Sequence, residues 1–424
     1  MKKEINKQMT DYMEAYTDLW AFSGSIAAVK NGEVIFEQSY GYANVEHKVP
    51  NTSNTKFRLY SISKQFTAVV ILMLEERGLL KVEDCVRKYF PDWVELDERI
   101  TIHQLLTHTS GLANYSEDKE FVKLHSQNTL TKRDDIVNCV NTRALDSEPE
   151  AKWKYCNTGY FVLELLIEKL SETSYPKFME ENIFEPLGMM DSGVYNDFHL
   201  IENKASGYYL DYYEIIPCEY VNMNIISACG GLYSTVLDLL KWDTALKSEQ
   251  LLTKNSIEKM NTNYENNYGY GVVVNTVDNK QLINHDGGYR GFLTVINRHL
   301  DDDFAIVVLS NYGFTNVGRV CSDLAKIALE KAYEMPSKPA EFAMSQEMIE
   351  SFVGFYDDDS DVPLVVTQTA DGLNLVFAGM FNFPIYPISE NTFHQKWIDE
   401  QYTFDRDEDG SLSFLSWKKR INKK

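Results

Sequence analysis

The order of strand-like and helix-like segments constrains the fold of this chain more than any other feature of its sequence. Residues 23–42 have the pattern of two strands joined at Asn31-Gly32, a pair that favours the tight turn of a β-hairpin. Strand patterning returns far along the chain, at residues 268–274, 292–298 and 304–311. Between about residues 79 and 246, apolar residues recur mainly at helical spacing. We therefore expect one sheet assembled from two distant segments, with a helical insertion between them.

The last part of the chain has a different pattern. Pro336 and Pro339 interrupt the segment E-M-P-S-K-P-A-E-F, and proline resists the continuation of a helix. Beyond them, short strand-like runs alternate with Gly, Asn and Asp turns. A chain of 424 residues also exceeds what one hydrophobic core normally supports. We expect a first domain over residues 1–335, which contains the helical insertion, and a small all-β, barrel-like domain over residues 340–424.

Charge and hydropathy exclude several classes of function. The 41 Lys and Arg residues face 63 acidic residues, and the net charge of −22 repels phosphate backbones and anionic lipids. No apolar stretch is long enough for a membrane helix, and the first residues lack the apolar core of a signal peptide. We therefore expect no nucleic-acid partner and no membrane span. We expect a cytoplasmic protein, or an exported one if a leader has been removed.

The cysteines and histidines of this chain do not have the spacing of metal ligands. The six cysteines are widely scattered without a C-x-x-C pair, which argues against a zinc site and against a dense disulfide scaffold. His103 and His108 lie five residues apart, which is not the spacing of two ligands on one helix face. We expect no metal ion, no cofactor, and free thiols in a reducing compartment.

The segment Ser61-Ile62-Ser63-Lys64 is the first candidate for chemistry. It precedes apolar residues at helical spacing, and Gly78 marks the expected end of that helix. Three residues apart at a helix start, Ser61 and Lys64 lie on one face, about one turn from each other. Burial and the positive end of the helix dipole disfavour the ammonium form, and a neutral lysine could accept the serine proton. Alone, this short motif is better explained by an N-cap serine and a solvated lysine.

Two further segments carry candidate groups. Tyr155-Cys156-Asn157 offers a phenol that can relay a proton and an amide that can hold a substrate carbonyl. His285-Asp286-Gly287-Gly288 ends a strand, where paired glycines allow close approach and an exposed N–H can face a developing oxyanion. Taken singly, each segment is better explained as a turn.

The three motifs occur together in the order S-x-x-K, Y-x-N and H-x-G, which is that of the penicillin-recognising serine hydrolases. The chain resembles class C β-lactamases, D-Ala-D-Ala peptidases and related esterases and D-aminopeptidases. The similarity spans about residues 20–331 and includes F-R-L-Y-S-I-S-K-Q-F-T, I-T-I-H-Q-L-L-T-H-T-S-G-L and A-C-G-G-L-Y-S-T-V-L-D-L-L-K-W. It implies a β-lactamase-like α/β fold, in which helices and a helical subdomain flank an antiparallel sheet, followed by a lipocalin-like β domain.

The resemblance also implies roles for individual residues. Ser61 would be the nucleophile, activated by Lys64, and Tyr155 would carry a proton to the leaving group. Asn157 would orient the substrate, and the backbone N–H groups of Ser61 and Gly288 would form the oxyanion hole. The implied substrate is a small amide, short peptide or ester that is cleaved through an acyl-enzyme.

One residue departs from the best-known members of this family. His285, on the wall opposite Ser61, stands where β-lactamases and cell-wall peptidases carry lysine, so a titratable group replaces a permanent cation. Relatives with H-x-G, here His285 to Gly287, resemble esterases, amidases or aminopeptidases. A true β-lactamase or D-Ala-D-Ala carboxypeptidase is the alternative enzyme, and a penicillin-binding sensor or scaffold without turnover is the alternative of another class. The sequence leaves the oligomeric state open.

Overall fold

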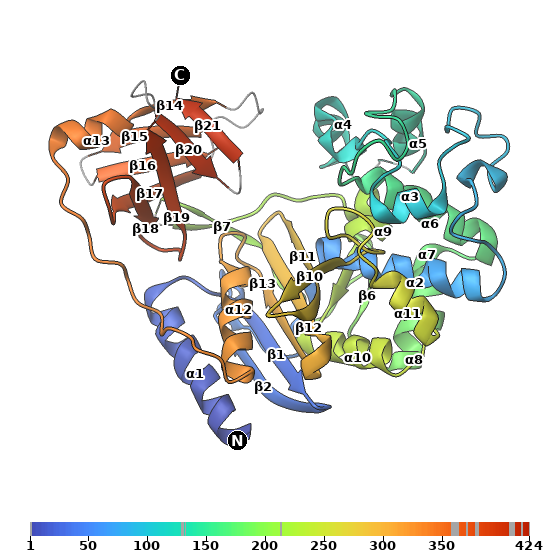
Figure 1. Cartoon of the computed structure of the whole chain (residues 1–424), viewed down its shortest axis with the longest axis horizontal. Helices are drawn as coiled ribbons and strands as arrows, with labels where there is room; N and C mark the ends of the chain where they lie inside the picture. The colour runs from blue at the N-terminus through green and yellow to red at the C-terminus, as the bar shows by residue number, and fades with distance from the viewer. Residues whose placement is uncertain are drawn as a thin grey trace.

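The computed structural model describes residues 2–128, 131, 133–212, 214–357, 364–369, 372–377, 381–406, 412–416 and 419–423. Figure 1 shows a central sheet flanked by helices, a group of helices on one side of it and a barrel on the other. Among the described residues, no helix is long and apolar enough to cross a membrane.

The helices of the described residues are α1 (Lys2–Leu19), α2 (Ser63–Glu76), α3 (Ile102–Thr107), α4 (Lys119–His125), α5 (Arg133–Asn141), α6 (Asn157–Ser171), α7 (Tyr175–Met179), α8 (Glu185–Leu187), α9 (Ser227–Gly230), α10 (Val236–Lys247), α11 (Lys254–Met260), α12 (Val317–Ala328) and α13 (Gln346–Phe352). The strands of the central sheet are β1 (Gly24–Lys30), β2 (Glu33–Tyr40), β10 (Val273–Val277), β11 (Lys280–Tyr289), β12 (Phe292–His299) and β13 (Phe304–Ser310). Short strands outside it are β3 (Tyr42–Asn44), β4 (Val49–Pro50), β5 (Phe57–Arg58), β6 (Gly193–Val194), β7 (Tyr208–Asp211), β8 (Glu214–Pro217) and β9 (Leu232–Ser234).

The central sheet joins the two distant segments that the sequence indicated. Its strand order is β10-β11-β12-β13-β1-β2, and all neighbouring strands are antiparallel. β1 pairs with β13 from Gly24 opposite Ser310 to Lys30 opposite Phe304. Asn31 and Gly32, which join β1 to β2, both have positive φ, as a tight hairpin turn requires. The predicted hairpin and the predicted sheet are both confirmed.

Helices cover both faces of this sheet (Figure 1). Ile306 and Val308 of β13 pack in one apolar cluster with α1 and α12, whereas Val307 and Leu309 pack in another with α2 and α10. Burial on both faces explains why β13 is a continuous apolar run. The sequence analysis did not predict α1, although its buried residues follow helical spacing at Ile5, Met9, Tyr12, Met13 and Tyr16.

The insertion between β2 and β10 is mainly helical, as expected, and it contains the predicted cap of α3. The Thr101 hydroxyl accepts from Gln104 N, and the Gln104 side chain accepts from Thr101 N, which is a complete capping box. The insertion also contains the hairpin β7–β8, which the helical interpretation of residues 79–246 missed. Alternating burial along Tyr208–Asp211 is a strand pattern, but it is only four residues long.

The C-terminal part of the chain forms a closed antiparallel barrel. Its strands are β14 (Gly354–Asp357), β15 (Leu364–Thr369), β16 (Gly372–Phe377), β17 (Phe381–Pro387), β18 (Thr392–Gln395), β19 (Gln401–Arg406), β20 (Leu412–Ser416) and β21 (Lys419–Lys423). Each pairs with the next and β14 pairs with β21, so the barrel has no open edge. The predicted architecture is confirmed: helices and a helical subdomain flank an antiparallel sheet, and a small β barrel follows. A lipocalin-like origin of the barrel and the division at residues 335 and 340 stay predictions.

Polar and apolar contacts dock the barrel on the rest of the chain. Tyr212 N, just after β7, donates to Asn382 O in β17 at 2.9 Å. Arg319 on α12 pairs with Asp399 at 3.0 Å. An apolar cluster also joins the two parts and contains Tyr208, Leu210, Tyr312, Phe314 and Ile398. Residues 331–345, which connect α12 to α13, form neither helix nor strand.

Candidate active site

Ser61 lies in a turn that leads into α2. A 3-10 turn covers Tyr60–Ile62, and α2 begins at Ser63 with no side-chain cap. The Ser61 hydroxyl is therefore not used as an N-cap. Tyr60 has a φ of 47°, a left-handed conformation that is costly for a residue with a side chain. Such a backbone persists only where the surrounding structure fixes it.

Strand β11 fixes this turn from one side. A Cβ at Gly287 would lie 2.1 Å from Leu59 O and 3.0 Å from Ser61 N, so only glycine allows the strand to approach this closely. Thr294 on the neighbouring strand donates to the same Leu59 oxygen at 2.9 Å. The turn is thus held against the sheet, and the direction of the Ser61 side chain is set.

The structure brings Ser61, Lys64 and Tyr155 together. The Tyr155 hydroxyl donates to Ser61 Oγ at 2.7 Å, and Lys64 Nζ lies 3.3 Å from the same oxygen. Lys64 is fully buried, and it also donates to Asn157 Oδ1 and to the Cys229 carbonyl, each at 2.8 Å. All three of these partners are uncharged.

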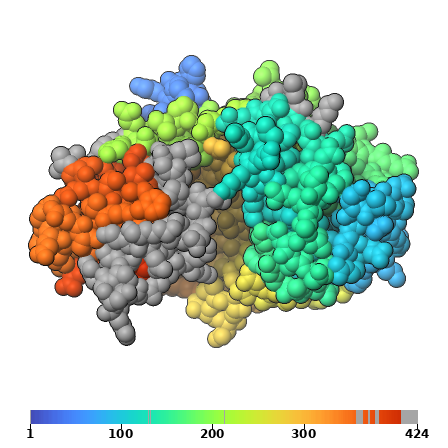
Figure 2. Space-filling model, turned by 90° about the horizontal axis from the view of Figure 1, so that it is seen from above, coloured from blue at the N-terminus to red at the C-terminus, as the bar shows by residue number. Residues whose placement is uncertain are grey.

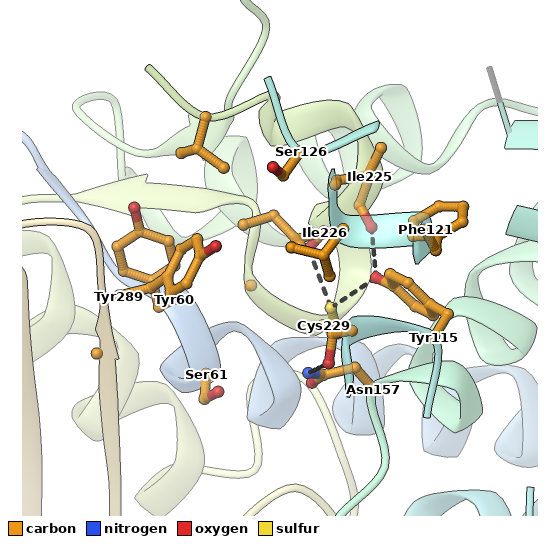
Figure 3. A pocket seen from close by; sticks show the side chains of 15 residues that line it. Tyr60, Ser61, Tyr115, Phe121, Ser126, Asn157, Ile225, Ile226, Cys229 and Tyr289 are labelled. Carbon is orange, nitrogen blue, oxygen red and sulfur yellow. Dashed lines mark hydrogen bonds between the residues drawn. The ribbon is translucent and has the colours of Figure 1, made fainter. Parts of the chain in front are cut away.

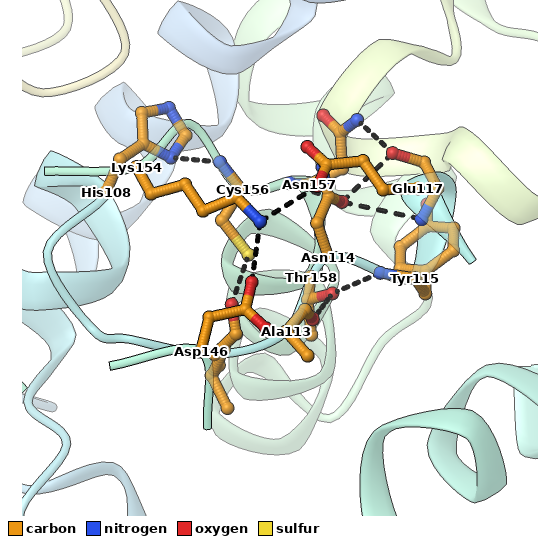
Figure 4. A network of polar contacts seen from close by, with 12 residues as sticks. His108, Ala113, Asn114, Tyr115, Glu117, Asp146, Lys154, Cys156, Asn157 and Thr158 are labelled. Atoms are coloured by element: carbon orange, nitrogen blue, oxygen red, sulfur yellow. Dashed lines mark hydrogen bonds and ion pairs between the residues drawn. The ribbon is translucent and has the colours of Figure 1, made fainter. Parts of the chain in front are cut away.

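A network of hydrogen bonds holds the segment that carries Tyr155 (Figure 4). Cys156 N donates to His108 Nδ1 at 3.1 Å, and Asn157 N donates to Asn114 Oδ1 at 3.2 Å. Burial lowers the pKa of His108 well below its usual value, so its ring stays neutral and can accept this bond. Backbone anchors on the two residues after Tyr155 leave its phenol little freedom to move away from Ser61.

Hydrogen bonds to both polar atoms of its amide orient the Asn157 side chain. Its oxygen accepts from Lys64, and its Nδ2 donates to Ser116 Oγ at 2.9 Å. Ser116 in turn donates to Asn114 Oδ1 at 2.9 Å. The amide orientation is therefore fixed by partners on either side, as a group that positions a substrate requires.

His285 is buried behind the site and is neutral. Its Nδ1 donates to Asp286 O at 2.6 Å, and its Nε2 accepts from the Tyr268 hydroxyl at 2.9 Å. Burial lowers the pKa of His285 to about 4, against the opposing effect of the Asp286 carboxylate, and the charge of Lys64 lowers it further. His285 is not among the described residues that line the cavity beside Ser61, and its role as a wall of the substrate site stays a prediction.

A cavity of about 170 Å³ opens beside Ser61. Figure 3 shows Ser61 and Asn157 at its base, with Tyr60 and Tyr289 on one side. Gly288 also lines it, so the backbone of Gly288 and the side chain of Ser61 face one space. Seen from above, the surface is hollowed between the barrel and the teal helical segment, with the ochre strands of the sheet at the floor (Figure 2).

The sequence analysis missed several residues of this site. His108, Asn114 and Ser116 anchor the Tyr155–Asn157 segment, yet nothing in their local sequence indicates a contact with residues about forty positions later. Tyr268, which donates to His285 Nε2, was also missed. Among the described residues, no group of His, Cys, Asp and Glu side chains could hold a metal ion.

The sheet, the helical insertion and the Ser61-Lys64-Tyr155 cluster define a serine hydrolase of the penicillin-recognising class. The family model described as Beta-lactamase matches residues 7–329. The chain therefore belongs to the beta-lactamase family of serine hydrolases, which confirms the resemblance seen in the sequence.

The chain is also similar to individual proteins with penicillin-binding or hydrolase names. The chain is 30% identical to a penicillin-binding protein of Bacillus subtilis (strain 168), over 98% of this chain and 97% of the relative. It is 26% identical to the teichoic acid D-alanine hydrolase of Staphylococcus aureus, over 76% and 78% of the two chains. Among solved structures, the octameric penicillin-binding protein homologue from Pyrococcus abyssi superposes with a TM-score of 0.68 at 25% identity, over 98% and 99% of the chains.

Proposed function

We propose that the protein hydrolyses a small amide, short peptide or ester through an acyl-enzyme on Ser61. The observation that carries this proposal is the contact of one serine oxygen with the Tyr155 hydroxyl at 2.7 Å and with Lys64 Nζ at 3.3 Å. A nucleophile within reach of two groups that can accept or donate a proton is the requirement of acyl transfer.

During acylation the proton of Ser61 is passed through Lys64 and Tyr155 to the leaving group. Ser61 Oγ attacks the substrate carbonyl carbon, and its proton passes to Lys64 Nζ. The backbone N–H groups of Ser61 and Gly288 stabilise the oxyanion, and each such donor contributes about 3 to 4 kcal/mol in comparable sites. Tyr155 gives a proton to the leaving oxygen or nitrogen as that bond breaks, and Lys64 returns a proton to Tyr155. Water then attacks the acyl-enzyme, and the acid and Ser61 are released.

The charges around the site favour a substrate without an obligatory carboxylate. His285 is neutral because its pKa is about 4, and both of its ring nitrogens are already paired. Lys64 has three partners inside the protein and does not extend into the cavity. An esterase, amidase or aminopeptidase therefore fits better than a D-Ala-D-Ala carboxypeptidase. Similarity to a teichoic acid D-alanine hydrolase supports a small D-amino-acyl group in the substrate.

Intact-protein mass spectrometry tests the proposal. The protein is exposed in separate samples to a penicillin and to 4-nitrophenyl acetate, and product release is followed in parallel. We expect turnover of the ester, and both turnover and any covalent adduct should disappear in Ser61→Ala. Ser63→Ala is the matched control, because Ser63 Oγ is buried and accepts from Leu232 N at 3.1 Å.

The outcomes separate the remaining candidates. Full activity in Ser61→Ala would contradict the mechanism. A stable adduct with penicillin and no product from either compound would favour a sensor, whereas rapid hydrolysis of penicillin would favour a β-lactamase.

A further inference from the structure

The Cys229 carbonyl is one of the two carbonyl groups that hold the Lys64 side chain. It accepts from Lys64 Nζ at 2.8 Å, and Asn157 Oδ1 accepts from the same nitrogen at 2.8 Å. Figure 3 shows Cys229 next to Asn157, above the turn that carries Ser61. With both bonds made, Nζ lies 3.3 Å from Ser61 Oγ, and proton transfer requires such a distance to be short and well defined. The position of Cys229 therefore affects how well Lys64 can serve Ser61.

Cys229 belongs to α9, a single helical turn without a cap of its own. The turn covers Ser227–Gly230, and Ile226 before it makes no side-chain cap. The first N–H groups of a helix have no partner inside the helix. Here a distant side chain supplies one, because Ala228 N donates to Glu164 Oε2 at 3.0 Å. Glu164 lies on α6, so α6 provides the cap that α9 lacks.

Glu164 is a buried acid in an otherwise apolar stretch of α6. It is 4% exposed, and its neighbours Leu163, Leu166 and Ile167 are buried as well. Burial raises the pKa of Glu164 to about 7, although Arg133, which pairs with Glu164 Oε1 at 2.8 Å, opposes this effect. Replacing a buried ion pair by apolar side chains is often neutral or stabilising. Stability of the fold alone therefore does not explain an acid at this position.

The residue before Cys229 is held at both of its backbone groups. Ala228 N is bound by Glu164, and Ala228 O accepts from Thr67 Oγ1 at 2.8 Å. Thr67 lies on α2, about one turn after Lys64, so α2 and α6 hold Ala228 from two sides. With both groups fixed, the chain enters Cys229 in one direction, which sets where the Cys229 carbonyl points.

We infer that Glu164 is a positioning residue for acylation, an inference that rests on the proposed function. Its hydrogen bond to Ala228 N holds α9 in place. The Cys229 carbonyl then keeps Lys64 Nζ within reach of Ser61. Glu164 is not among the described residues that line the cavity, so its effect on the reaction passes through α9 and Lys64. A misplacement of about 1 Å in a reacting group can slow a reaction by roughly a hundredfold.

Two substitutions separate the reach of the Glu164 side chain from its charge. Glu164→Asp keeps the carboxylate but withdraws it from Ala228 N by one methylene group. Glu164→Gln keeps the reach and an acceptor oxygen but removes the charge. The acylation rate constant is measured as single-turnover release of 4-nitrophenolate from 4-nitrophenyl acetate, above pH 7, where Glu164 is ionised. We expect Glu164→Asp to lower it roughly ten- to hundredfold and Glu164→Gln to lower it less than about threefold.

Glu168→Asp is the matched control on the same helix. Glu168 lies about one turn after Glu164 and pairs with the same Arg133, but its other oxygen accepts from Tyr175 N at the start of α7. We expect this variant to change the acylation rate constant less than about twofold, and urea unfolding shows whether each variant is folded in the assay. Unchanged acylation in Glu164→Asp would overturn the positioning role. An equal or larger loss in Glu164→Gln would overturn it too, because charge would then matter and not reach.

Thr67→Val tests the same turn if Glu164→Asp does not fold. It removes the hydroxyl that donates to Ala228 O and keeps a branched side chain. We expect acylation to slow by roughly three- to tenfold, the effect of one hydrogen bond, and an unchanged rate would overturn the inference.

Failure of the inference can be told apart from failure of the proposed function. If Ser61→Ala abolishes turnover but Glu164→Asp acylates at the rate of the unaltered protein, the positioning role is wrong and the acyl-enzyme mechanism stands. If Ser61→Ala keeps turnover, the mechanism itself is wrong, and the inference about Glu164 falls with it.

Discussion

His285 is a residue whose ionisation changes on folding. Its pKa falls from an ordinary value near 6.5 to about 4, because burial disfavours the imidazolium. The unfolded chain therefore binds a proton between pH 6.5 and pH 4 that the folded protein does not. This difference stabilises the folded protein above pH 6.5, and the stabilisation is lost as the pH falls towards 4.

The free energy of unfolding should therefore depend on pH through His285. Between pH 7 and pH 5, His285 alone should reduce it by about 1 to 2 kcal/mol. His285→Gln should remove this part of the pH dependence in urea unfolding at the two pH values, whereas His47→Gln, at an exposed position, should not. Identical pH dependence in His285→Gln and the unaltered protein would show that His285 is not buried in its neutral form. Glu164 contributes a pH dependence of the opposite sign, because burial raises its pKa to about 7. Since Glu164 is present in all variants, its contribution cancels in the comparison.

At the scale of elements, the packing of β11 against the turn before α2 depends on one of two adjacent glycines. A Cβ at Gly287 would meet backbone, 2.1 Å from Leu59 O, whereas a Cβ at Gly288 would meet the flexible end of Leu293 at 2.7 Å. We expect Gly287→Ala to lower the free energy of unfolding by about 2 to 3 kcal/mol or more, because the strand must move away from the turn. Gly288→Ala should cost less than about 1 kcal/mol. Chemical denaturation of both variants checks this, and equal losses would contradict it.

Sequence patterns were sufficient where a local rule determines the structure. The Asn31-Gly32 hairpin, the continuous apolar β13 and the Thr101 cap each follow from residues that are neighbours in the chain. The motifs also indicated that Ser61, Lys64 and Tyr155 belong to one site. The left-handed backbone of Tyr60 was not predictable, because contacts with β11 and β12 impose it from residues more than two hundred positions away. The hairpin β7–β8 was missed for a similar reason, since its strands are short and pack against distant residues.

At the scale of the whole molecule, we propose that residues 1–335 and 340–424 are two domains that stay docked. The linker offers a test, because Glu341 is exposed in a segment without helix or strand. Cleavage by a glutamyl endopeptidase should occur there first and leave two resistant fragments. The fragments should elute together on gel filtration, since Arg319–Asp399 and the Tyr208–Ile398 apolar cluster join them. Glu334 is exposed in the same segment, so Glu334→Gln combined with Glu341→Gln should delay the cut, and rapid loss of both fragments would contradict two independent domains.

The pairing of β1 with β13 has a consequence for the synthesis of this protein. Gly24 and Ser310 are opposite each other in the finished sheet, but β1 leaves the ribosome long before β13 is made. At roughly 5 to 20 residues per second, β1 waits on the order of tens of seconds for its partner strand. During that time the apolar Ile26 and Ala28 lack the neighbours that cover them in the folded protein. The nascent hairpin is therefore a segment that needs protection by a chaperone, and a ribosome that stalls before β13 would release a chain prone to aggregation.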